Sequence, residues 1–194
     1  MILFIKVYNI KTFSCKIYSN MMFKSFIPFA HAQSVYEIDP EFYIKQGVKT
    51  LFIDLDNTLD SYKAHNPKEE TIDLINKIKK LNVTPVIISN NKPHRVCGYA
   101  DALGIEYLAS ARKPFSKKIK LEISKRGLKN DEVMLVGDQM MTDVLAGHGA
   151  KIRVVLTEKI VKEDQWTTHI NRLMDRPIRK YHRKKGNLKD WRTM

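Results

Sequence analysis

The sequence predicts an α/β fold with a doubly wound parallel sheet. Three observations predict it: short apolar segments alternate with segments of helical periodicity from residue 48 onward, polar residues follow several apolar segments directly, and Gly or Pro stands at many junctions. This alternation implies right-handed crossovers, which place helices on both faces of the sheet. A chain of 194 residues can bury one such domain and carry shorter extensions.

The expected strands are short and rich in Val, Ile, Leu and Phe, which is typical of strands buried on both faces. The first lies within 50–58, Thr-Leu-Phe-Ile-Asp-Leu-Asp-Asn-Thr, and the others span 83–88, 107–109, 133–136 and 153–156. Apolar residues at helical spacing and the flanking Pro and Gly residues predict helices over 41–46, 68–80, 93–103, 116–126 and 142–146.

We divide the chain into four segments. Lysines interrupt the apolar run of residues 1–22, so these residues fit a signal peptide poorly. They form either a basic amphipathic leader that lies on membranes or an extension upstream of the true start at Met21 or Met22. Residues 23–47 form an N-terminal arm that packs across the sheet edge. Residues 48–157 form the core, and residues 158–194 form a strongly basic C-terminal tail.

The charge balance indicates an anionic partner. The net charge is +13 and the isoelectric point is about 9.7, which suits a nucleic acid, an acidic membrane surface or a phosphorylated substrate. The two cysteines, Cys15 and Cys97, are too few for a disulfide scaffold and suit a reducing cytoplasm. No segment approaches the roughly 18 consecutive apolar residues of a membrane span.

Polar side chains follow three of the expected strands, and a parallel sheet brings such strand ends to one rim. The candidate residues are Asp54, Asp56, Ser89, Asn90, Lys113, Asp138 and Asp143. Taken singly, each is more often a turn residue, a helix cap or a solvated charge. Taken together and in order, they offer carboxylates for Mg²⁺, a hydroxyl and an amide for phosphate oxygens, and a lysine to neutralise charge, a set that suits phosphoryl transfer.

These motifs resemble those of the haloacid dehalogenase-like (HAD) superfamily of aspartate-nucleophile phosphatases. The resemblance covers Asp54-Leu-Asp-Asn-Thr58, Ser89, Lys113 and Gly137-Asp-Gln-Met-Met-Thr-Asp143. More narrowly, Ser34-Val-Tyr-Glu-Ile, Ile88-Ser-Asn-Asn and Ala111-Arg-Lys-Pro are similar to the YqeG family of subclass IIIA. That family is related to the mitochondrial phosphatidylglycerophosphate phosphatase. The resemblance implies an HAD-like Rossmannoid sheet and an active enzyme.

The resemblance also implies roles for the first motif. Asp54 would attack phosphorus and form an aspartyl-phosphate, a known use of a carboxylate nucleophile. Asp56 would protonate the leaving oxygen and then activate water. Thr58 would cap the turn that follows these two residues.

The remaining motifs would bind phosphate and metal. Ser89 and Lys113 would hold the transferring phosphoryl group, with Asn90 nearby. Asp138 would ligate Mg²⁺ together with Asp54 and the backbone carbonyl of Asp56. Asp143 would orient either the metal shell or Lys113.

The spacing leaves no room for a cap domain, because the fold already uses residues 60–83 and 91–112. An uncapped site suits a phosphate on a large partner, such as a lipid headgroup, a nucleic-acid end or a protein. The resemblance favours an anionic phospholipid, phosphatidylglycerophosphate or a similar exposed phosphate. The expected location is the cytoplasm, with peripheral binding to the inner face of the membrane.

Two other functions stay open from the sequence. The chain could be a nucleic-acid or ribosome-associated binding protein with a vestigial site, in which the basic tail binds the phosphate backbone. Alternatively, it could be a cytosolic phosphatase for a nucleotide or a sugar phosphate, which would turn over soluble metabolites without lipid. The sequence does not specify the oligomeric state.

Overall fold

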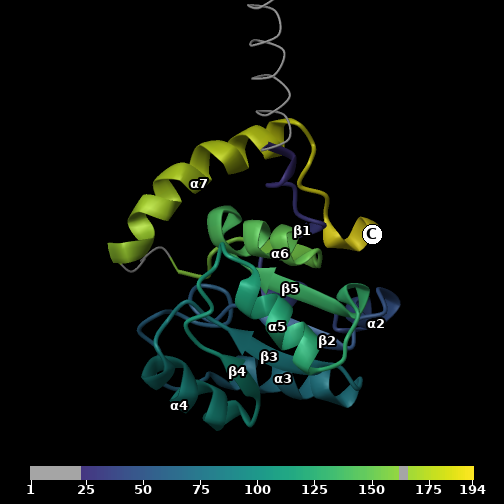
Figure 1. Ribbon diagram of the computed structural model, residues 1–194, viewed down its shortest axis with the longest axis vertical. Helices are drawn as coiled ribbons and strands as arrows, with labels where there is room; N and C mark the ends of the chain where they lie inside the picture. Colours follow the sequence, from purple (N-terminus) through teal and green to yellow (C-terminus); the bar gives the residue numbers. More distant parts are fainter. Residues whose placement is uncertain (1–22, 162–165) are drawn as a thin grey trace, which may run out of the picture.

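The computed structural model describes residues 23–161 and 166–194 of the chain (Figure 1). Both interpretations of the leader therefore concern residues outside the described part. Within the described residues, one six-stranded sheet has the order β1-β6-β5-β2-β3-β4, and every neighbouring pair is parallel. The strands are β1 (Ala30–Ala32), β2 (Thr50–Ile53), β3 (Thr84–Ile88), β4 (Glu106–Leu108), β5 (Val133–Gly137) and β6 (Arg153–Thr157).

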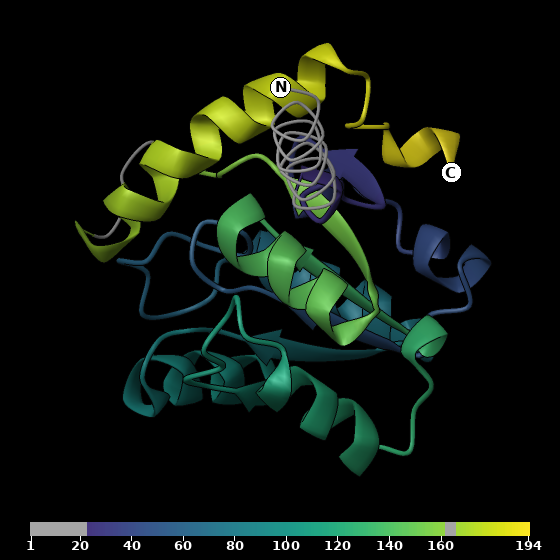
Figure 2. The ribbon, with the colours of Figure 1, turned by 45° about the horizontal axis from the view of Figure 1, so that its top comes forward.

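Helices cover both faces of this sheet, which confirms the doubly wound fold. One face packs against α2 (Glu41–Lys45), α3 (Glu69–Lys80) and α4 (Pro93–Leu103). The other packs against α5 (Lys117–Lys125) and α6 (Leu145–Ala150), which lie in front of the sheet in Figure 1. A long helix, α7 (Trp166–Lys184), follows β6 (Figure 2).

The sequence of the central strand explains the two cores. Successive side chains of a strand point to opposite faces, so Leu51 and Ile53 join the core beneath α3 and α4, whereas Phe52 joins the core beneath α5 and α6. All three are fully buried. Two-sided burial is the reason that β2 reads as a continuous apolar run rather than an alternating one.

Strand register places the candidate residues at one edge. Ile53 of β2 lies opposite Ile87 of β3 and Val136 of β5. The chain leaves these strands within one or two residues, through Asp54, Ser89 and Asp138. The connections 60–83 and 91–112 contain only α3, α4, β4 and loops, so the described residues include no separate cap domain.

The N-terminal arm contributes a strand that the sequence did not predict. β1 pairs with β6 at the edge of the sheet. The arm therefore packs across the sheet edge as the edge strand itself. The division of the chain into segments stays a prediction, but a boundary at residue 47 would separate β1 from the sheet to which it belongs.

The basic tail also returns to this edge. The His31 amide donates to the carbonyl of Lys189 (2.7 Å), and the Trp191 ring lies edge-on to Phe42 with centroids 5.6 Å apart. A short 3-10 turn, η4 (Trp191–Thr193), follows Asp190, whose carboxylate accepts from the Arg192 amide. The C-terminal residues are therefore packed against the arm.

The helix predicted over 142–146 begins earlier and ends later in the structure. A π-helical turn, η3 (Met140–Val144), leads directly into α6. Gly147 lies inside α6 and does not end it. The missing side chain of Gly147 lets α6 approach β6, since a Cβ there would lie 2.1 Å from a methyl carbon of Val154. None of the helices in the described residues is long and apolar enough to cross a membrane.

A charged cluster joins β1, the end of β6 and α7. One carboxylate oxygen of Glu158 lies 2.9 Å from His31 Nε2, 3.0 Å from Arg179 Nη1 and 2.7 Å from Arg183 Nη2. The hydrogen bond from His31, assisted by the charges of Arg179 and Arg183, lowers the pKa of Glu158 from 4.5 to about 2 despite partial burial. The ionised carboxylate therefore stabilises the contact of α7 with the sheet.

We predict that Glu158 makes stability depend on pH between about 4.5 and 2. Because its pKa is lower in the folded state, its contribution is complete above 4.5 and is lost as the pH falls through this window. Urea midpoints of the wild type and Glu158→Gln should therefore converge on acidification. Glu70→Gln, at an exposed glutamate, is the control. A gap that stays constant from pH 5 to about pH 2 would contradict this assignment.

Candidate active site

The centre of the site is a buried lysine between two carboxylates. Lys113 Nζ lies 2.5 Å from Asp54 Oδ1 and 2.6 Å from Asp143 Oδ1, and it also donates to the carbonyl of Ile88 at 3.0 Å. Lys113 is 6% exposed and Asp54 is 7% exposed, so water screens these contacts little. Breaking a buried pair of this kind by removing one partner typically costs about 3–5 kcal/mol.

Burial and neighbouring charge set the protonation of this centre. Burial raises the pKa of Asp54 well above its usual range; Lys113 opposes this shift, while Asp143 and Asp138 add to it. Burial alone would lower the pKa of Lys113, but Asp143 and Asp54 outweigh burial and raise it, so the ammonium stays protonated. One ammonium among several carboxylates leaves the centre with an excess of negative charge.

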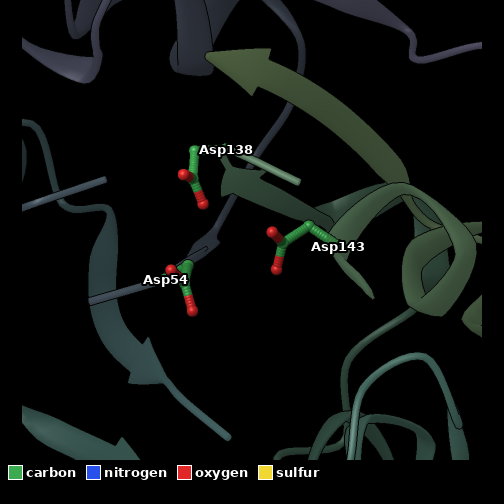
Figure 3. Close-up of side chains that lie close together, drawn as sticks. All are labelled: Asp54, Asp138 and Asp143. Atoms are coloured by element: carbon green, nitrogen blue, oxygen red, sulfur yellow. The ribbon is translucent and has the colours of Figure 1, made fainter. Parts of the chain in front are cut away.

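A divalent cation fits this excess of charge. Asp54, Asp138 and Asp143 each offer a carboxylate oxygen within 4.8 Å of the others (Figure 3). Asp138 and Asp143 are fully buried. Buried carboxylates held this close together repel one another unless a cation separates them, and hard cations such as Mg²⁺ prefer oxygen ligands. The acidic cluster is therefore suited to binding a metal ion.

The second aspartate of the first motif has partners that the sequence did not indicate. Asp56 Oδ2 accepts from Asn91 Nδ2 (2.7 Å), and its Oδ1 lies 3.1 Å from Arg95 Nη2. Arg95 also donates to the carbonyl of Ser61 at 3.3 Å. The Asp56 carboxylate is thus held by Asn91 and Arg95. Asn91 is the last residue of the Ile88-Ser-Asn-Asn motif, but Arg95 carries no sequence signal beyond being one of many basic residues.

Ser89 and Asn90 lie where β3 ends but use their side chains differently. Ser89 is buried, and its hydroxyl accepts from the Asn91 amide at 3.0 Å. Asn90 bonds the backbone of Lys113 twice: its Oδ1 accepts from the Lys113 amide (2.7 Å) and its Nδ2 donates to the Lys113 carbonyl (2.8 Å). Asn90 therefore holds the lysine in place. Its direct binding of phosphate stays a prediction.

The turn that follows Asp54 and Asp56 is closed by backbone hydrogen bonds. The amides of Leu59 and Asp60 donate to the carbonyl of Leu55 at 3.0 and 3.1 Å. Thr58 is fully buried in this turn, and its hydroxyl makes a long contact of 3.5 Å with Asp54 Oδ2. Thr58 thus belongs to the turn and its hydroxyl faces Asp54, while its role as a cap stays a prediction.

Gly137 gives Asp143 the space that it occupies. A Cβ on Gly137 would lie 2.3 Å from the carboxyl carbon of Asp143, a distance that real atoms do not reach. Asp143 is further fixed by the Gln139 amide, which donates to its Oδ2 at 3.0 Å. The glycine at the end of β5 is therefore a steric requirement of the site. Asp143 contacts Lys113 and also belongs to the acidic cluster, so both roles implied for Asp143 stay predictions.

Helix α7 contacts the loop that follows β5. Arg179 Nη2 donates to the backbone carbonyl of Asp138 at 2.7 Å, and Arg179 Nη1 donates to the carbonyl of Thr157 at 3.2 Å. Asp175 is buried, and its Oδ1 accepts from the Met141 amide at 3.0 Å. The tail that the sequence presents as a run of charge thus fixes the backbone of a candidate metal ligand.

Comparison with known proteins agrees with this geometry. The sequence model of the haloacid dehalogenase-like hydrolase family matches residues 2–157. The probable phosphatase YqeG of Bacillus subtilis (strain 168) is 30% identical over 168 residues, which cover 87% of this chain and 98% of that protein. The chain belongs to the haloacid dehalogenase-like hydrolase family. The expected relation to YqeG and the assignment as a phosphatase of this family are thereby confirmed.

Solved structures of low sequence identity are also similar in part. A putative 3-deoxy-D-manno-octulosonate 8-phosphate phosphatase from Vibrio cholerae is 14% identical, with a TM-score of 0.49 over 74% of this chain and 92% of that chain. An uncharacterized protein from Listeria monocytogenes serotype 4b is 13% identical, with a TM-score of 0.49 over 69% of this chain and 99% of that chain.

We predict that Gly137→Ala lowers kcat at least about tenfold, because the new methyl group displaces Asp143 and with it Lys113. The fold should persist, as judged by circular dichroism. Gly98→Ala is the matched control, because a Cβ at that helical position meets nothing within 4 Å. Wild-type kcat in Gly137→Ala would contradict the steric argument.

We also predict that Arg179→Met raises the metal concentration needed for half-maximal activity about tenfold, since groups that orient metal ligands typically affect affinity on this scale. The substitution removes the hydrogen bond to the Asp138 carbonyl, together with the contacts of Arg179 to the Thr157 carbonyl and to Glu158. Arg176→Met removes an exposed charge from the same helix and should leave the metal requirement unchanged. Equal metal requirements in the two variants would show that the contact is only structural.

Proposed function

We propose that the chain is a magnesium-dependent phosphomonoester hydrolase that uses Asp54 as its nucleophile and passes through an aspartyl-phosphate intermediate. The observation that carries this proposal is the buried contact of Lys113 with Asp54 and Asp143 at the open rim of the sheet. An ammonium held between carboxylates suits phosphoryl transfer, in which catalysis consists mostly of positioning and charge compensation.

Asp54, Asp138 and the backbone carbonyl of Asp56 are the groups that would hold Mg²⁺. When bound, this ion offsets the negative charge of the phosphoryl oxygens and allows the Asp54 carboxylate to approach phosphorus. The closeness of the carboxylate oxygens of Asp54 and Asp138 supports their part in this assignment.

In the first step, an oxygen of Asp54 forms a bond to phosphorus while the bond between phosphorus and the ester oxygen breaks. Asp56 donates a proton to the departing oxygen, so the leaving group is a neutral alcohol. Lys113 and the Ser89 hydroxyl bind the other phosphoryl oxygens. Asn90 supports this step because it fixes the backbone of Lys113.

In the second step, Asp56 removes a proton from water, and the oxygen of that water bonds to phosphorus. The bond from phosphorus to the Asp54 oxygen breaks, which regenerates Asp54 and releases inorganic phosphate. Asn91 and Arg95 hold the Asp56 carboxylate during both steps. They therefore act as positioning residues for proton transfer.

The proposed substrate is phosphatidylglycerophosphate or a similar phosphate exposed on an anionic phospholipid. An uncapped rim admits a phosphate that projects from a larger surface, and a net charge of +13 favours an anionic one. The proposed place of action is the cytoplasmic face of a membrane, with peripheral binding. A nucleic-acid end has the same charge and is the competing substrate class.

We predict that Asp54→Asn abolishes phosphate release while circular dichroism and the urea midpoint show a folded protein. EDTA should abolish wild-type turnover, and Mg²⁺ should restore it. The assay compares phosphatidylglycerophosphate in mixed micelles with nucleotides, sugar phosphates and a 5′-phosphorylated oligonucleotide.

Exposed Asp101→Asn is the control for a change of one carboxylate to an amide. Lipid turnover that needs both Asp54 and Mg²⁺ supports the proposal. Turnover of soluble esters or of the oligonucleotide alone would keep the mechanism and refute the lipid substrate. Undiminished activity of Asp54→Asn would refute the nucleophile.

A further inference from the structure

The loop that carries Lys113 continues into an exposed apolar surface. Phe115 is 73% exposed and Leu121 is 56% exposed, although both are large apolar side chains. Together with Ala111 and the stems of three basic residues, they line an open hollow of about 550 Å³. We call this the α5 face; its residues are Ala111, Arg112, Phe115, Lys117, Lys118 and Leu121. No described element lies in front of α5 in Figure 1.

The charge on the α5 face has one sign. Arg112 and Lys117 are exposed, and the Lys118 ammonium is fixed at the rim by the carbonyl of Ser110 at 2.6 Å. The nearest acid on the helix, Glu122, is paired with Arg126 at 2.9 Å. Apolar side chains surrounded by lysine and arginine are typical of surfaces that enter the interface of an anionic bilayer.

The α5 face adjoins the candidate active site along the chain. Phe115 comes two residues after Lys113, and the Phe115 amide donates to the Arg112 carbonyl at 2.9 Å, which closes a turn around the lysine. The lysine side chain points into the protein to Asp54, whereas the Phe115 side chain is exposed. A surface that receives Phe115 would therefore lie beside the rim where the proposed phosphate binds.

We propose that the α5 face docks the enzyme on the surface of an anionic phospholipid bilayer, with Phe115 and Leu121 entering the interfacial layer and Arg112, Lys117 and Lys118 contacting headgroups. This proposal rests on the proposed function for its purpose, because docking here presents a lipid phosphate to the site. It rests on the exposure and charge of the α5 face for its evidence.

The apolar side chains favour a bilayer over a nucleic acid. A phosphate backbone is recognised by basic side chains and by backbone amides, and it offers no apolar phase to bury Leu121. A bilayer accepts both kinds of side chain at once. The two partners therefore predict different effects of removing the apolar residues.

The test measures co-sedimentation of the full chain with vesicles of phosphatidylcholine alone or mixed with phosphatidylglycerol. We expect binding only to the mixed vesicles. The Phe115→Ser/Leu121→Ser variant should lower the partition coefficient at least about tenfold, because it removes the two apolar side chains that docking would bury in the interfacial layer. Its turnover of p-nitrophenyl phosphate, which needs no membrane, should stay at the wild-type level.

The matched control is Leu173→Ser/Met174→Ser on α7, because these side chains are 72% and 52% exposed and lie on another basic helix. Undiminished vesicle binding by the α5 variant, or loss only in the α7 control, would overturn the proposal. Binding to polyuridylate without binding to vesicles would overturn it in favour of a nucleic acid.

A second variant tests docking without removing a contact. Phe115→Trp should show a blue shift of fluorescence on addition of mixed vesicles beyond that of the wild type, and no extra shift would overturn the proposal. Vesicle binding requires no catalysis, so its failure is distinguishable from that of the proposed function. Binding through the α5 face without hydrolysis of lipid phosphate would support the face and refute only the substrate.

Discussion

The buried contact of Lys113 with Asp54 and Asp143 is the interaction on which the rest of the site depends. A lone charge in this environment would be strongly disfavoured, so each of the three residues requires the others. The pairing leaves an excess of negative charge, since Asp138 lies in the same cluster. That excess gives a physical reason for a divalent cation, and the charge of that cation, together with the Lys113 ammonium, would attract a phosphate.

The surrounding fold supports this contact from three directions. Parallel strand register brings Asp54 and Asp138 to one edge, and Gly137 leaves the space that Asp143 fills. Asn90 fixes the backbone of Lys113 from the end of β3. Arg179 of α7 fixes the carbonyl of Asp138 from the other face of the loop. The strands therefore place the charges, and polar contacts between loops set their orientation.

Much of this architecture could be predicted from the sequence, because the central strands are continuous apolar runs and their ends carry the motif residues. β1 could not, since Ala30-His31-Ala32 contains no β-branched residue and no Phe, Tyr or Trp, and gains its place only by pairing with β6. Arg95 and Arg179 could not either. In the sequence, Arg95 and Arg179 look like any solvated basic residue. Only their tertiary contacts, to Asp56 and to the Asp138 carbonyl, set them apart.

The central claim is that Asp54 becomes covalently phosphorylated. The most direct measurement is a single turnover with Mg²⁺ and the best substrate of the phosphate-release panel, quenched in acid within the first turnover and followed by mass spectrometry of the peptides. We expect the added mass of one phosphoryl group on Asp54, and its disappearance at longer times as free phosphate forms. Phosphate release at the wild-type rate without any modified Asp54, or with the phosphoryl group on another residue, would contradict the account.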